Sequence, residues 1–382
     1  MPEKTHIYEG SHAIALTIKN IAPDVVSAYP ITPQTHIVED LAKIKANGEA
    51  DYEYVRAESE FAAASIVLGA SATGARVYSA TSSQGLLLMT EVVYNIAGLR
   101  LPVVMTCANR SVSAPINIWN DHSDVMSIRD AGWIQLFAAD NQEAVEQHVL
   151  AYKLAEQLSL PVMVNVDGYI LTHSFEPVTI PSGELIKKYL PPYQPEIETF
   201  LDPEHPVTLG AFFTPASYME TREKLHADLR DSLKIITKEY RLLQKTLNNK
   251  ISDDGLVEYY GPTNPSTILV ALGSVIGTMR EVIKTQKNVG ILKIKVFRPF
   301  PDAAIQKIIG RAKNVAVVEK AISLGQGGPL YTDLKAALDN RKLNLKNYIV
   351  GLGGRDVTAK IIKDIIKDAG RKNKILKFCG KI

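Results

Sequence analysis

The chain has 382 residues, 46% of them hydrophobic and 22% charged, and a formal net charge of +2 at pH 7. That length allows two domains with separate cores, while the small net charge argues against a dedicated nucleic-acid-binding protein, which usually has a strong basic excess. Because Cys107 and Cys379 are its only cysteines, the chain alone cannot supply the full set of thiolates that normally holds an iron–sulfur cluster.

The sequence has no stretch that approaches the roughly 20 apolar residues of a membrane helix. Residues 1–6 include charged side chains and lack the apolar run of a signal peptide. We therefore expect a cytoplasmic protein that does not interact with a membrane.

Over the first 175 or so residues, short apolar runs typical of strands alternate with longer helical patterns. This rhythm predicts right-handed crossovers and a doubly wound parallel sheet covered on both faces. Strands are expected at residues 24–29, 52–56, 76–80, 102–107, 134–138 and 161–166. Helices are expected at residues 35–45, 60–72, 84–98 and 141–158.

The pattern changes between residues 176 and 264. Prolines recur from Pro177 to Pro206 and are expected to break any regular element, which predicts an extended arm over the surface. Residues 217–249 then carry Leu and Ile at spacings of three and four. That spacing predicts one long, charged helix with a single apolar stripe.

From residue 265 a second alternating unit begins. Strands are expected at 267–272, 289–296, 315–318 and 348–350, with a helix at 278–284, and they predict a small parallel sheet. The predicted organisation is a first domain at 1–175, a linker with the arm and the long helix at 176–264, and a second domain at 265–382.

The segment Tyr29-Pro-Ile-Thr-Pro33 follows the first predicted strand. Its prolines restrict the backbone and so aim the hydroxyl of Thr32 at little entropic cost. Open parallel sheets bind ligands at the carboxyl ends of their strands, which makes Thr32 a candidate site residue. A plain proline-rich turn explains the same residues.

Glu60 stands where a predicted strand leads into an alanine-rich helix. The first-turn amides of a helix stabilise a carboxylate, so a helix cap is one interpretation and an acid–base group is the other. Glu58, two residues earlier, competes with Glu60 for the second role.

Arg110 follows the predicted strand at 102–107. Its planar guanidinium matches a carboxylate, although an arginine at a strand end is more often a surface charge. Downstream, Trp119 is expected to wall a pocket or to pack on a partner chain, because a large aromatic side chain is costly to expose. Asp121 and His122 are candidates for titration near pH 7, with a structural histidine as the favoured alternative.

Two further turns carry polar or glycine-rich sequence. The hydroxyls and helix-start amides of Thr81-Ser-Ser-Gln-Gly85 suit hydrogen bonding to a cofactor ring or a neighbouring subunit, while helix capping alone explains Ser82 or Ser83. The turn Gly325-Gln-Gly-Gly328 precedes a helical segment and offers amides to a phosphate. A simple turn is the favoured interpretation of this second segment.

Three of these motifs together carry a family resemblance. Tyr29-Pro-Ile-Thr-Pro33, Glu58-Ser-Glu60, and Arg110 with Ile118-Trp-Asn-Asp-His122 resemble the pyrimidine-binding domain of the alpha subunit of pyruvate:ferredoxin oxidoreductases, in the 2-oxoacid:ferredoxin oxidoreductase family. The region from residue 265 is similar to the transketolase C-terminal-type domain of the same subunit. The resemblance covers nearly the whole sequence. It implies a thiamine-diphosphate-binding α/β domain followed by a transketolase C-terminal-like α/β domain.

The resemblance also implies a role for each candidate residue. Glu60 would hydrogen-bond the aminopyrimidine ring and activate the cofactor. Thr32 would contact the 2-oxo acid, and Arg110 would bind its carboxylate. The further implied contacts are Pro30, Ile31, Ser82 and Gln84 for the cofactor, and Trp119 and Asn120 for the substrate pocket.

Half of a cofactor site implies a partner chain. The resembled class binds magnesium through a Gly-Asp-Gly motif, which is missing here: Val166-Asp-Gly168 and Gly353-Gly-Arg-Asp356 lack the flanking glycines in order. We therefore predict no metal site in this chain and expect Mg²⁺ and the diphosphate site on a partner. The [4Fe-4S] clusters are likewise expected on partners, within an assembly of alpha, beta, gamma and delta subunits.

The activity implied by the resemblance is the reversible, thiamine-dependent oxidative decarboxylation of pyruvate with coenzyme A to acetyl-CoA and CO2, with electrons passed to ferredoxin. Ile118-Trp-Asn-Asp-His122 favours the pyruvate branch over the 2-oxoglutarate branch. Two alternatives stay open. One is a 2-oxoisovalerate:ferredoxin oxidoreductase alpha subunit, because one methylene in a pocket is worth only about 1–3 kcal/mol. The other is a non-catalytic scaffold subunit, against which the presence of Thr32, Glu60 and Arg110 argues.

Overall fold

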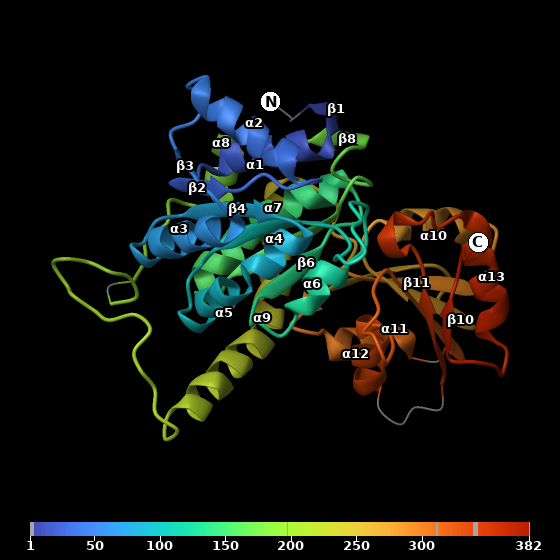
Figure 1. Cartoon of the computed structure of the whole chain (residues 1–382). Coiled ribbons are helices and arrows are strands. Elements are labelled where there is room, and N and C mark those ends of the chain that lie inside the picture. Colours follow the sequence, from blue (N-terminus) through green and yellow to red (C-terminus); the bar gives the residue numbers. More distant parts are fainter. Residues whose placement is uncertain (1–3, 197, 311, 339–342, 382) are drawn as a thin grey trace.

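The larger of the two main sheets has the strand order β12-β6-β7-β5-β4-β2-β3 (Figure 1). The computed structural model describes residues 4–196, 198–310, 312–338 and 343–381; residues 1–3, at the charged start of the sequence, lie outside them. The strands from β2 to β7 pair in parallel, which confirms the predicted sheet. Their bounds are β2 (Val25–Ala28), β3 (Glu53–Arg56), β4 (Val77–Thr81), β5 (Val104–Asn109), β6 (Ile134–Phe137) and β7 (Val162–Asp167).

Helices cover both faces of this sheet, and β4, β5 and β7 are buried at every residue. Full burial on both faces is typical of a parallel sheet in an α/β domain. The predicted helix at 84–98 is divided into two helices that adjoin at Met89. The helices of this layer are α1 (Gly10–Ile21), α2 (Thr35–Ala46), α3 (Glu60–Ala72), α4 (Ser83–Leu88), α5 (Thr90–Gly98), α6 (Ser123–Ser127) and α7 (Asn141–Leu158).

The proline-rich region contains regular structure that the sequence pattern did not predict. β8 (Phe175–Thr179) pairs antiparallel with β1 (Thr5–Glu9), and α8 (Gly183–Tyr189) follows, so the expectation that prolines break every element here is wrong. Pro177 fits because both strands of a two-stranded sheet are edge strands, where alternate backbone N–H groups need no partner. Beyond α8, the described residues between 190 and 217 form no helix or strand and project from the sheet as a long loop (Figure 1).

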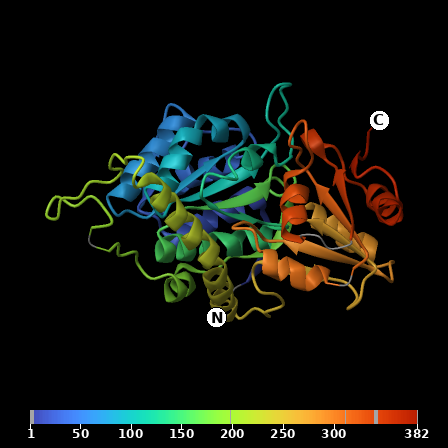
Figure 2. The same cartoon turned by 90° about the horizontal axis from the view of Figure 1, so that it is seen from below.

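The long charged helix is confirmed as α9 (Tyr218–Thr246). Its buried face carries Leu225, Ile236, Tyr240 and Leu243, at the predicted spacing. α9 packs against α7 and α8, and Figure 2 shows it lying across the first domain. Burial of the apolar stripe on another helix therefore explains why so polar a segment is helical.

The second sheet has the order β15-β14-β13-β10-β11-β9 and is parallel except for β9, which runs against β11. Alternate residues of β10 belong to different hydrophobic clusters, one with α10 and α13 and the other with α11 and α12. Helices therefore cover both faces here too. The bounds are β9 (Val257–Tyr260), β10 (Thr267–Ala271), α10 (Val275–Ile283), β11 (Val289–Ile294), α11 (Asp302–Ile309), β13 (Asn314–Glu319), α12 (Pro329–Leu338), β14 (Asn344–Ile349), α13 (Ala359–Ala369) and β15 (Leu376–Phe378).

The segment that follows β11 joins the two sheets. The predicted strand at 289–296 ends at Ile294 as β11, and β12 (Val296–Arg298) pairs antiparallel with β6 of the first sheet. Phe137 donates its backbone N–H to the carbonyl oxygen of Lys295 at 2.8 Å. The side chain of Lys293 also reaches Glu143 of α7, with Nζ and Oε2 2.7 Å apart. Within the described residues, no helix is long and apolar enough to cross a membrane.

Candidate active site

The carboxyl ends of the parallel strands meet at one edge of the first sheet, and the predicted site residues follow these ends. Thr32 follows β2, Glu60 follows β3, Ser82 follows β4 and Arg110 follows β5. These four residues lie along one edge because the strands that precede them are parallel. Their side-chain environments depend on the tertiary structure.

Glu60 is the first residue of α3, and only 9% of it is exposed. The cap of this helix is Ser59, whose Oγ accepts the N–H of Ala62 at 3.1 Å, so Glu60 is not the N-cap residue. Glu58 is exposed. The structure thus separates the two glutamates, and burial favours Glu60 as the chemically active one.

Gly85 makes room for the carboxylate of Glu60. A Cβ atom added at Gly85 would lie 2.8 Å from Oε1 of Glu60 and 2.6 Å from Oγ1 of Thr81. Both distances are shorter than side-chain carbons tolerate. Gly85 therefore contributes to the site because any side chain at this position would collide with Glu60. The sequence motif alone did not reveal this role.

We expect Gly85→Ala to lower kcat by roughly tenfold or more, because the added methyl group displaces the carboxylate of Glu60 from its position. Initial rates of the activity that the family resemblance implies, in the assembled complex, measure this loss. Gly98→Ala is the matched control, since a Cβ atom there meets no atom within 4 Å. Equal activity of the two variants would contradict the assigned position of Glu60.

The turn after β4 holds polar atoms without partners. Among the described residues, Oγ1 of Thr81, Oγ of Ser82 and Nε2 of Gln84 are buried and have no hydrogen-bond partner. Ser82 occupies the N-cap position of α4, but its side chain makes no capping bond, which weakens the capping interpretation. Buried unpaired polar groups cost about 1–3 kcal/mol each, so a ligand that binds them stabilises this turn.

Arg110 and the turn of Thr32 lie together. The Nη1 group of Arg110 donates to the carbonyl oxygen of Thr32 at 2.9 Å, and Nε donates to the carbonyl oxygen of Asn117 at 2.9 Å. Burial lowers the pKa of Arg110 from its ordinary value. Pro30 and the side chain of Thr32 are exposed, and Ile31 is half-buried. Both backbone contacts fix the direction of the guanidinium.

Gln34, which the sequence analysis did not single out, ties this turn to the sheet. It is fully buried and donates from Nε2 to the carbonyl oxygen of Ala80 at 2.7 Å. Its Oε1 accepts the backbone N–H of Ile31 at 3.3 Å. One amide therefore orients the Thr32 turn relative to β4.

Asp124 is a second residue that the sequence analysis missed. Its fully buried carboxylate accepts the backbone N–H groups of Ser83 at 3.0 Å, Arg110 at 2.9 Å and Val125 at 2.7 Å. Burial raises its pKa to about 6. A single side chain thus holds the turn after β4 and the segment after β5 at a fixed distance, which positions Arg110 relative to Ser82.

Asp124→Ala is expected to lower the free energy of unfolding by roughly 3 kcal/mol, because buried N–H groups lose their acceptor. In the unchanged chain, folded Asp124 keeps its proton up to about pH 6, whereas an unfolded Asp loses it near pH 4. The folded state therefore binds more protons in this window, and stability falls as pH rises from about 4 to about 6. Denaturant unfolding at several pH values measures both effects.

Asp130→Ala is the control for that change, because Asp130 is exposed. Its effect is expected to stay within about 0.5 kcal/mol. A loss in Asp124→Ala no larger than this would show that the carboxylate does not hold the two turns together.

Trp119 and Asn120 line a cavity of about 560 Å³ together with Tyr169 and Lys320, and Thr32 and Arg110 are not among its lining residues. Trp119 is half-exposed and lies against Tyr169, with ring centroids 4.6 Å apart. Asn120 is buried, and its Oδ1 accepts from Nζ of Lys320 at 2.8 Å. The structure therefore gives Asn120 a contact between the two domains, and its predicted substrate contact stays a prediction.

His122 belongs to a buried ionic cluster at the same junction. Its Nε2 lies 2.6 Å from Oδ1 of Asp167, and Nζ of Lys320 lies 2.8 Å from Oδ2 of that carboxylate. The hydroxyl of Ser274 also donates to Asp167. Burial acts to raise the pKa of Asp167, but Lys320 and His122 hold it well below its ordinary value. These contacts favour a structural histidine, and they occupy the aspartate of the Val166-Asp-Gly168 run.

The amides that follow the glycine-rich turn near residue 325 already have an acceptor. The carboxylate of Glu319 accepts the backbone N–H groups of Leu330 at 2.9 Å and Tyr331 at 3.2 Å, at the start of α12. Burial raises the pKa of Glu319 to about 7. Because a side chain already binds these amides, the simple turn is the better interpretation.

Models of known protein families match two parts of this chain. Residues 17–241 match the family model described as pyruvate flavodoxin/ferredoxin oxidoreductase, thiamine diphosphate-binding. Residues 266–362 match core domain II of pyruvate:ferredoxin oxidoreductase. The fold and these two matches thus define a subunit of an oxidoreductase with a thiamine diphosphate-binding domain. The chain belongs to the pyruvate flavodoxin/ferredoxin oxidoreductase family, which confirms the resemblance seen in the sequence.

Curated relatives are similar to this chain over almost its full length. The pyruvate synthase subunit PorA of Methanocaldococcus jannaschii is 47% identical, over 94% of this chain and 93% of the relative. The ketoisovalerate oxidoreductase subunit VorA of Pyrococcus horikoshii is 40% identical, over 95% of this chain and 92% of the relative.

A solved structure shows the same fold. The 2-oxoglutarate:ferredoxin oxidoreductase from Magnetococcus marinus matches with a TM-score of 0.73 at 23% sequence identity. The match covers 96% of this chain and 65% of that chain. At this identity the likeness supports the architecture, with its two α/β units, and no particular substrate.

Proposed function

We propose that this chain is the alpha subunit of a pyruvate:ferredoxin oxidoreductase. Such an enzyme converts pyruvate and coenzyme A to acetyl-CoA and CO2, reversibly, and passes the electrons to ferredoxin. The observation that carries the proposal is the buried carboxylate of Glu60, which lies against Gly85 at the ligand-binding edge of a parallel sheet.

The residues present fit one half of thiamine diphosphate. Glu60 is positioned to exchange a hydrogen bond with the aminopyrimidine, and the unpaired polar atoms of Ser82 and Gln84 are available to the same ring. Pro30 and Ile31 complete the proposed cofactor contacts. When bound, the cofactor supplies a nucleophilic carbon and an electron sink for decarboxylation.

The substrate side of the proposal rests on Arg110. Contacts with two backbone carbonyl groups hold its guanidinium in place, and among the described residues Nη2 has no hydrogen-bond partner. This nitrogen is suited to the carboxylate of a 2-oxo acid. Thr32 contributes its exposed hydroxyl beside Arg110. The proposal also keeps Trp119 and Asn120 as substrate contacts, and they line a neighbouring cavity whose lining does not include Thr32 or Arg110.

The remaining parts of the enzyme belong to partner chains in this proposal. Both cysteines are free, and Cys107 is fully buried with its pKa raised by burial. The [4Fe-4S] clusters, the Mg²⁺ ion and the diphosphate site are therefore assigned to beta, gamma and delta subunits, in a cytoplasmic assembly.

Large exposed apolar side chains near the site suit a partner surface; they are Tyr29, Val55, Phe61, Leu87 and Leu88. The proposal also keeps the predicted division of the chain into a first domain at 1–175, a linker at 176–264 and a second domain at 265–382.

Activity of the assembled complex tests the choice of substrate. We expect kcat/KM for pyruvate to exceed that for 2-oxoisovalerate by roughly tenfold or more, because the larger side chain must fit a pocket formed for a methyl group. Ferredoxin reduction at varied concentrations of each acid measures the ratio. The inverse ratio would assign the chain to the 2-oxoisovalerate branch, which the similarity to VorA keeps as the second candidate. Failure to use either acid would support a scaffold subunit.

A further inference from the structure

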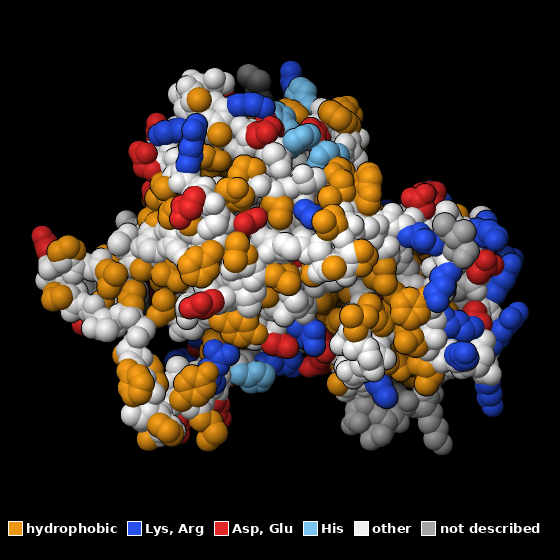
Figure 3. Space-filling view, viewed as in Figure 1, with side chains coloured by type: hydrophobic (Ala, Val, Ile, Leu, Met, Phe, Trp, Pro, Cys, Tyr) orange, Lys and Arg blue, Asp and Glu red, His pale blue; other side chains and the backbone are white. Residues whose placement is uncertain are grey.

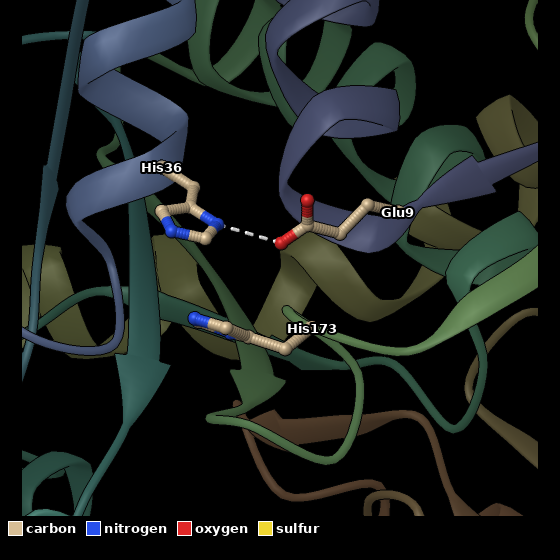
Figure 4. A group of neighbouring side chains, drawn as sticks. All are labelled: Glu9, His36 and His173. Atoms are coloured by element: carbon tan, nitrogen blue, oxygen red, sulfur yellow. Dashed lines mark hydrogen bonds and ion pairs between the residues drawn. The ribbon is translucent and has the colours of Figure 1, made fainter.

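We propose that Glu9, His36 and His173 form a binding site for a divalent transition-metal cation such as Zn²⁺, separate from the thiamine site. The three residues come from the end of β1, the first turn of α2 and the loop after β7. One ligand atom from each lies within 4.8 Å of the other two. Figure 4 shows the three side chains converging on the same space.

The distances suit a metal ion after a small adjustment. Nδ1 of His36 lies 2.7 Å from Oε1 of Glu9, and the rings of His36 and His173 have centroids 4.6 Å apart. Around a tetrahedral Zn²⁺ ion, with bonds of about 2.0–2.2 Å, ligand atoms lie roughly 3.4 Å from one another. None of the three side chains is fully buried, so they have room to rotate toward this geometry.

The hydroxyl of Thr172 orients the ring of His173. Oγ1 of Thr172 lies 2.7 Å from Nδ1 of His173. This contact occupies one ring nitrogen and leaves Nε2 for the ion, in the way that outer partners orient metal-binding histidines.

The donor set selects the class of cation. Two imidazoles and one carboxylate are typical ligands of zinc and similar transition metals, whereas Mg²⁺ prefers oxygen ligands alone. The site is therefore distinct in kind from the Mg²⁺ site that the proposed function assigns to a partner. It departs from the sequence-based prediction of no metal site in this chain, which rested on the missing Gly-Asp-Gly motif. Three protein ligands also leave a coordination position for water or another small ligand.

A nearby pair of residues on α1 and α2 provides a matched comparison. Nδ1 of His12 in α1 lies 2.9 Å from Oδ2 of Asp40 in α2, but no third ligand joins them in the described metal-ligand clusters. Figure 3 shows that histidine side chains gather at this end of the molecule. Mutation of His12 therefore tests whether Zn²⁺ binds at the specific three-ligand site or at surface histidines in general.

Isothermal titration of the full chain with Zn²⁺ alone, without a histidine tag and after treatment with a chelator, tests the proposal. We expect one ion per chain, and at least tenfold weaker affinity in His36→Ala and in His173→Ala. Glu9→Gln should also weaken binding, since it keeps a hydrogen-bonding group and removes the charge. Circular dichroism of the metal-free variants verifies that they are folded.

The controls are His12→Ala and His205→Ala, each of which removes a histidine that pairs with an aspartate. Both should bind Zn²⁺ as the unchanged chain does. Unaltered affinity in His36→Ala and His173→Ala would overturn the proposal, and so would an equal loss in His12→Ala. Neither result depends on thiamine diphosphate or on the partner subunits, so the test is independent of the proposed enzyme activity.

Discussion

Replacement of Glu60 by alanine is expected to reduce kcat of the assembled enzyme by roughly 10²–10⁴-fold, the usual contribution of a positioned acid–base group. Under the proposed function, this carboxylate shares a proton with the cofactor ring. The helix should persist, because Ser59 supplies the cap of α3. Steady-state rates and a thermal unfolding curve of the variant measure these two expectations.

Two further variants separate chemistry from packing. Glu60→Gln keeps the shape of the side chain and loses its ability to exchange a proton, so it should lose activity to a similar extent. Glu58→Ala should retain normal turnover, because Glu58 is exposed. If Glu60→Ala turned over pyruvate normally, Glu60 would have no place in the chemistry.

Arg110→Ala is expected to raise KM for pyruvate by about 10- to 100-fold, since a hydrogen bond to a charged group contributes about 1.5–3 kcal/mol. The KM for coenzyme A should change far less, because coenzyme A has no carboxylate for the guanidinium to bind. Initial rates with each substrate varied in turn measure both constants.

Arg110→Lys and Arg129→Ala are the controls. A lysine keeps the positive charge but loses the planar fork, so an intermediate KM for pyruvate is expected. Arg129 is a partly exposed arginine one loop further along the chain, and its removal should leave both constants unchanged. An equal rise in both constants for Arg110→Ala would count against carboxylate binding.

Local patterns predicted helices best where a capping residue and the apolar spacing mark the same boundaries. The helices at 60–72 and 141–158 end where they were expected, and each has a side chain that caps it, Ser59 and Asp140. The elements that were missed, such as β8 and the paired β1, depend on each other for their hydrogen bonds. A proline-rich edge strand has no period of its own by which to recognise it.

The candidate site follows the same division. Thr32, Glu60 and Arg110 were candidates because each follows a predicted strand in a short polar motif, and the family resemblance implied their roles. Gly85, Gln34 and Asp124 were missed as site residues, because their contribution is a space or a hydrogen bond to a segment distant in sequence.

The amino-acid sequence by itself determined the class of fold, the family and the edge of the sheet that carries the candidate site, because strand periodicity, helix caps and strand-end motifs are local. Only the tertiary structure decided how the parts meet. It placed β12 beside β6, joined His122 and Lys320 through Asp167, and brought Glu9 to His36. These contacts join residues that are far apart in the chain, so they arise from the packing of whole elements and not from any pattern within one of them.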